Sequence, residues 1–162
     1  MKPKKYFILI LFLFLLYIPD MIAGDYISEN LIIDVSIDNR KEEYYLDIIL
    51  TNISNSNIKI TSHDAPWMSG YVNMIDFIVS AVSIDLGQPL EIVLPTLYLN
   101  YKEYQIKPNQ SLKGHINLSE IIPDLNRISK ISDIVIFWTY KPVFYDDSLI
   151  AKRSGGWLIV KK

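Results

Sequence analysis

The sequence predicts an all-β domain made of two packed antiparallel sheets with about seven or eight short strands. Three observations lead to this expectation. From Glu29 onward apolar and polar residues alternate with period two, polar turn residues separate the alternating runs, and only one short segment has helical spacing. No sequence repeat of fixed period is visible, which argues against a propeller or a solenoid. Two stacked sheets bury the apolar side of every such strand.

The strand segments follow one another along the chain with polar turns between them. We expect strands at 31–38, 43–53, 58–61, 75–84, 111–118, 134–140 and 157–160, with one or two more within 90–104. The strands 43–53 and 58–61 are expected to form a hairpin, because Asn and Ser occupy positions 52 and 54–57. The segment 75–84 is apolar on both faces, which is typical of a strand buried in the centre of a sheet.

Outside the strands, one helix and one polar excursion are expected. The segment 119–131 has apolar residues at 121, 122, 125 and 128, but Pro123 limits it to one or two turns, with Ser119 as its cap. The segment 141–156 is polar. Strands of this number and length favour a single immunoglobulin-like sandwich over a closed barrel.

The first 24 residues are typical of a secretory signal peptide. Lysines at 2, 4 and 5 precede an uninterrupted apolar run at 6–18, and Ala23 and Gly24 supply small residues for cleavage. The run is shorter than the roughly 20 residues that span a bilayer. Cleavage after Ala23 or after Gly24 leaves a β-sandwich domain at 25–162, located in the periplasm or outside the cell, with no further membrane span. The alternative is an uncleaved anchor, because Met21 and Ile22 extend the apolar stretch.

Composition excludes several kinds of chemistry. The chain has no Cys, which removes disulfides, thiolate metal sites, thiol nucleophiles and a lipid-modified N-terminal Cys. Its net charge is −2, and without the leader it is near −4, because the leader holds three Lys and one Asp. With no basic surplus, nucleic acid and anionic membrane surfaces are poor candidate partners.

No catalytic or metal-binding motif is present. His115 falls on the polar side of its strand, and His63 lies beside Asp64 in a loop, where a metal ligand or proton shuttle is conceivable. One His and one Asp are too few for a zinc site, which takes three or four ligands. The acidic pairs at 42–43 and 146–147 lack the arrangement across a cleft that glycosidases use. We therefore predict no catalytic residue, no metal site and no cofactor, and a protein that is not an enzyme.

The tryptophans divide between core and surface. Trp138 alternates in register with Ile134 and Ile136, which predicts a core position, and Trp157 is expected to cover one end of the sandwich. Trp67 lies in a loop between Pro66 and Gly70. It is either an anchor for a partner or, as we favour, a lid folded back on the core. The candidate partner-binding residues are therefore His63, Asp64 and Trp67.

The order of these segments resembles that of known exported proteins. The runs Leu46–Ile60, Asp64–Trp67, Ile106–Leu118 and Ile136–Tyr140 resemble uncharacterised exported bacterial proteins with an immunoglobulin-like sandwich. They are also similar to the N-terminal prodomain of deuterolysin-type metallopeptidases, without the catalytic domain or its zinc-binding His-Glu pattern. The resemblance implies a sandwich fold. From the residues themselves we expect a non-enzymatic binding or structural protein, whose loops at 63–73 and 141–156 meet an unknown protein or cell-envelope partner. The alternative, which the similarity to a prodomain implies, is a peptidase-directed inhibitor or chaperone.

Overall fold

The protein is an all-β antiparallel sandwich, as the alternation predicts. The computed structural model describes residues 26–27, 30–67, 77–93, 101–144 and 152–162, and the expected signal peptide lies outside them. The first sheet has the order β1-β2-β3-β8, formed by β1 (Tyr26–Ile27), β2 (Leu31–Arg40), β3 (Glu43–Asn52) and β8 (Ser111–Asn117). The second sheet has the order β10-β9-β5-β6, formed by β10 (Ser154–Val160), β9 (Ile134–Tyr140), β5 (Phe77–Ser83) and β6 (Gln88–Pro89).

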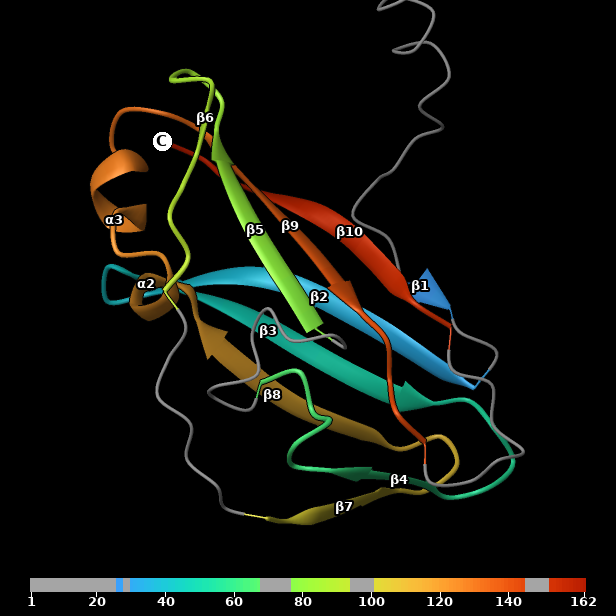
Figure 1. Ribbon diagram of the computed structural model, residues 1–162. Helices are drawn as coiled ribbons and strands as arrows, with labels where there is room; N and C mark the ends of the chain where they lie inside the picture. The colour runs from blue at the N-terminus through green and yellow to red at the C-terminus, as the bar shows by residue number, and fades with distance from the viewer. Residues whose placement is uncertain (1–25, 28–29, 68–76, 94–100, 145–151) are drawn as a thin grey trace, which may run out of the picture.

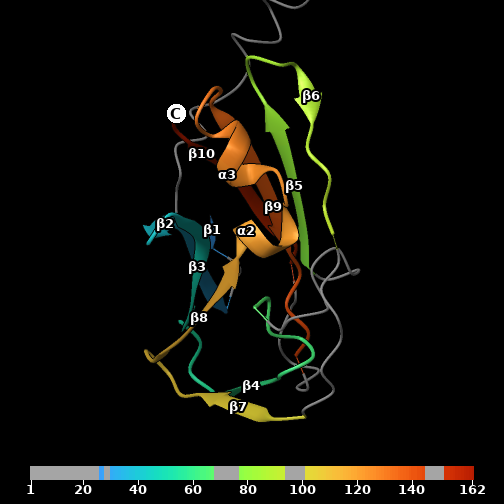
Figure 2. The same cartoon turned by 90° about the vertical axis from the view of Figure 1, so that its left-hand side faces the viewer.

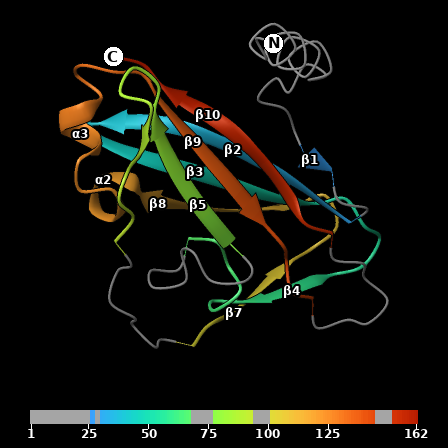
Figure 3. The same cartoon turned by 45° about the horizontal axis from the view of Figure 1, so that its top comes forward.

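A separate two-stranded sheet lies below one end of the sandwich. It pairs β4 (Ile58–Thr61) with β7 (Glu103–Ile106), and all strand pairs that the structure describes are antiparallel. Figure 1 shows this pair at the lower end, and Figure 3 shows β5, β9 and β10 lying over β2, β3 and β8. Among the described residues, eight strands have four residues or more, which agrees with the expected number.

The core lies between the two sheets and is made of the inward side chains of alternating positions. On β9 the inward residues Ile134, Ile136, Trp138 and Tyr140 are all buried, as predicted, with Trp138 only 3% exposed. They face the inward residues of the first sheet, among which Leu46, Ile48 and Leu50 are completely buried. The period-two pattern therefore identified the core side of these strands, because neighbouring side chains in a strand point to opposite faces.

The hairpin of β2 and β3 is longer than expected. Residues 39 and 40, expected in the turn, continue β2, and only Lys41 and Glu42 remain between the strands. Both have positive φ angles, of 53° and 69°. A two-residue loop with this geometry matches the twist of paired strands, so the strands stay in register up to the turn.

The expected hairpin between residues 43–53 and 58–61 is wrong. Both edges of β3 are already occupied, by β2 and by β8, and β4 pairs with β7 instead. The buried Asn52 holds the chain where it leaves the first sheet after β3. Its Nδ2 donates to the carbonyl oxygens of Ser56 (2.7 Å) and Ile106 (2.8 Å), and its Oδ1 accepts from the backbone N of Ser54 (2.9 Å). The polar segment is a turn, but it leads the chain into another sheet.

Two short helices close one end of the sandwich. They are α2 (Leu118–Ile121) and α3 (Leu125–Ile128), and the apolar residues at 121, 122, 125 and 128 are buried as expected. Figure 2 shows both helices beside the strands of the two sheets. The cap of α2 is Asn117 rather than Ser119, because the Asn117 side chain accepts from the backbone N of Ser119 (3.0 Å). The Ser119 hydroxyl instead accepts from the backbone N of Tyr44 (2.9 Å), which joins the helix to β3.

Candidate functional site

The loop that follows β4 holds the three residues singled out from the sequence, and Asp64 is part of its framework. The backbone N atoms of Asp64 and Ala65 both donate to the carbonyl oxygen of Thr61 at 3.1 Å, which makes a tight turn. The Thr61 hydroxyl donates to Asp64 Oδ2 (2.5 Å). The hydroxyl of Tyr140 reaches from β9 and donates to the Asp64 carbonyl oxygen (2.9 Å). Asp64 therefore ties the loop to the second sheet.

His63 and Trp67 lie in the same loop but are turned toward different neighbours. The imidazole ring of His63 lies 5.7 Å from the ring of Tyr101, which is 65% exposed. Trp67 is half-buried and packs against the core. A Cβ atom added to Gly114 of β8 would lie only 2.0 Å from Cδ2 of the Trp67 indole. The indole thus covers Gly114. This position matches the interpretation of Trp67 as a lid on the core, which we favoured from the sequence over a partner anchor.

Polar side chains cover the outer face of the first sheet. The Arg40 guanidinium donates to Asp38 (2.8 Å) and to both carboxylate oxygens of Asp47, and it lies 4.8 Å from the centre of the Tyr45 ring. The hydrogen bonds to Asp38 first, and then to Asp47, raise the pKa of Arg40 above its ordinary value. His115 is exposed as expected, and the centre of its ring lies 5.5 Å from the centre of the Tyr45 ring in a T-shaped arrangement. A hollow of about 320 Å³ beside Arg40 has three charged residues in its lining, Arg40, Asp47 and Lys113, and Asp47 is already bound to the Arg40 guanidinium.

The structure describes no metal centre. Within the described ranges, no group of three or more His, Asp or Glu side chains could hold a metal ion. The buried hydroxyl groups of Ser83 and Ser132 hydrogen-bond each other at 2.8 Å, and Ser132 Oγ also accepts from the backbone N of Asp85 (3.0 Å). These contacts fix the chain where β5 ends and before β9 begins, so they account for both buried hydroxyls.

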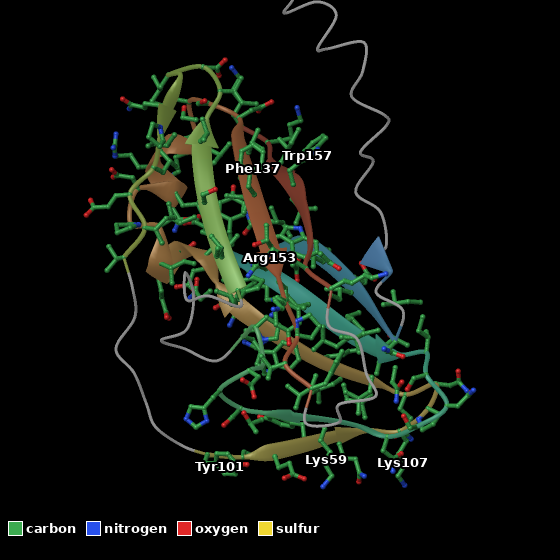
Figure 4. The ribbon with its side chains drawn as sticks, turned by 45° about the vertical axis from the view of Figure 1, so that its right-hand side comes forward. Lys59, Tyr101, Lys107, Phe137, Arg153 and Trp157 are labelled. Carbon is green, nitrogen blue, oxygen red and sulfur yellow. The ribbon has the colours of Figure 1, made fainter. Side chains whose placement is uncertain are left out.

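The outer face of the second sheet is apolar, in contrast to the first. Phe137 on β9 is 44% exposed, and it stands directly opposite Trp157 on β10 in the strand register. Ile78 on β5 is 42% exposed. We call this surface the apolar face, because six of its nine outward positions on these strands are apolar: Ile78, Val82, Val135, Phe137, Trp157 and Ile159. The other three are Ser80, Thr139 and Gly155. Figure 4 shows Phe137 and Trp157 beside each other, with Arg153, the residue before β10, lower in the view.

The apolar face corrects two expectations. Trp157 does not cover an end of the sandwich: β10 begins at Ser154, so Trp157 lies in mid-strand with its partner Phe137. The doubly apolar segment 75–84 was expected to be buried on both sides. The described strand β5 does lie inside its sheet, between β9 and β6, but only one of its faces is buried. The sequence therefore contained the evidence for this exposed face, because three strands have apolar residues at their outward positions as well as at their inward ones.

Comparisons with known proteins add no family to this description. No protein-family model matches the chain, and no curated protein matches it significantly. In the described part of the chain, no helix is long and apolar enough to cross a membrane. The functional argument therefore rests on the residues of the two outer faces.

Proposed function

We propose that the protein is an exported, non-enzymatic binding module that meets its partner in the cell envelope through the apolar face. The observation that carries this proposal is the exposure of Phe137, which lies next to Trp157, and of Ile78 on one side of the sandwich. The other side has a charged and hydrogen-bonded surface. Contiguous exposed apolar patches larger than a few hundred Å² mark interaction sites on soluble proteins. Aromatic side chains supply large contact area at such sites.

The export part of the proposal is supported by the lysines, the apolar run and the small residues at the start of the chain. We expect the mature protein to begin at Gly24 or Asp25. Intact mass spectrometry of the protein recovered from the producing cells measures this directly. Recovery of the uncut chain in the membrane fraction would replace the cleaved leader by an anchor.

The non-enzymatic part is supported by how the polar groups of the candidate loop are used. The carboxylate and carbonyl of Asp64 accept hydrogen bonds from Thr61 and Tyr140, and the Trp67 indole packs on Gly114. Groups held this way stabilise the loop. A binding role through a flat outer face needs no reactive group, which makes it the simpler function for this chain.

Photo-crosslinking from the two faces tests the proposal. A photoreactive amino acid replaces Phe137 in the apolar face or, as the matched control, exposed Lys113 on the outer face of the first sheet. We expect irradiation of producing cells to attach another molecule, protein or lipid, from position 137 and none from position 113. Equal labelling from both positions, or labelling from position 113 alone, would refute the assignment of the apolar face.

A further inference from the structure

We draw no further inference here: the strongest candidate, the apolar face around Phe137 and Trp157 on β9 and β10, belongs to the site already described, and nothing in the structure shows what covers it.

Discussion

The contact between Trp67 and Gly114 predicts whether an alanine at position 114 lowers or raises the free energy of unfolding. A Cβ atom at Gly114 would lie 2.0 Å from Cδ2 and 2.2 Å from Cγ of the indole, much closer than nonbonded carbon atoms approach. These atoms are near the root of the side chain, so the whole ring must move to make room. Gly114→Ala should therefore cost about 1–3 kcal/mol of unfolding free energy through overpacking. Without the clash, the same change in a strand stabilises by about 0.4–1 kcal/mol, because alanine restricts the unfolded chain.

Removing the Trp67 indole should reverse the sign of the stability change that Gly114→Ala causes. Trp67→Ala alone should cost about 3 kcal/mol, at the low end for a large ring, since Trp67 is half-buried. In that background the space over Gly114 is open, so adding Gly114→Ala should be neutral or stabilising. The interaction energy between the two substitutions should then be at least about 1 kcal/mol, in the range for residues in direct contact.

Urea denaturation of the four proteins in this cycle measures all the terms. Gly87→Ala is the matched control, because a Cβ there meets nothing within 4 Å and its only cost is the strain of a φ of 63°. That cost, about 1 kcal/mol, should be the same with Trp67 present or absent. Equal costs of Gly114→Ala in both backgrounds would refute the reasoning. A Trp67→Ala protein of unchanged stability would restore the partner-anchor interpretation of this residue.

Three further predictions follow from described contacts. Trp138→Ala should cost about 3–5 kcal/mol by urea denaturation, and Phe137→Ala, next to it but outward, clearly less; equal costs would contradict the inward register of β9. Asn52→Leu should cost about 2 kcal/mol or more, since the carbonyl oxygens of Ser56 and Ile106 lose their donor, and an unchanged midpoint would show that water replaces the amide. The hydrogen bond from Lys161 first, and then that from the backbone N of Lys162, lowers the pKa of Asp133. Its ionised form therefore stabilises the fold above about pH 4, and this contribution is lost as the pH falls through the lowered pKa, so Asp133→Asn should be less stable than wild type at pH 7 and approach it in acid.

Much of the secondary structure could be predicted because it depends on local pattern. The limits of β9 at 134–140 and its four inward residues follow from alternation alone, since the direction of each side chain is set by strand geometry. The apolar spacing within 119–131 likewise gave two short helical turns with buried residues. In the candidate loop, the sequence left Trp67 as either a partner anchor or a lid on the core, with the lid favoured.

What only the tertiary structure decided is which strands pair and which faces stay open. The residue pattern of β4 is the same whether it pairs with β3 or with β7. The choice depends on β8, which occupies the second edge of β3 and leaves β4 to pair with β7. The paired residues Thr51 of β3 and Ser111 of β8 are 60 residues apart in the chain. The outward apolar residues of β5 and β9 are equally compatible with strands that are buried on both faces and with strands that are buried on one face. Whether another layer covers them is a long-range outcome of packing, and here Phe137 and Ile78 remain exposed. Local geometry determines where a side chain points, whereas the assembly of distant segments determines what it meets.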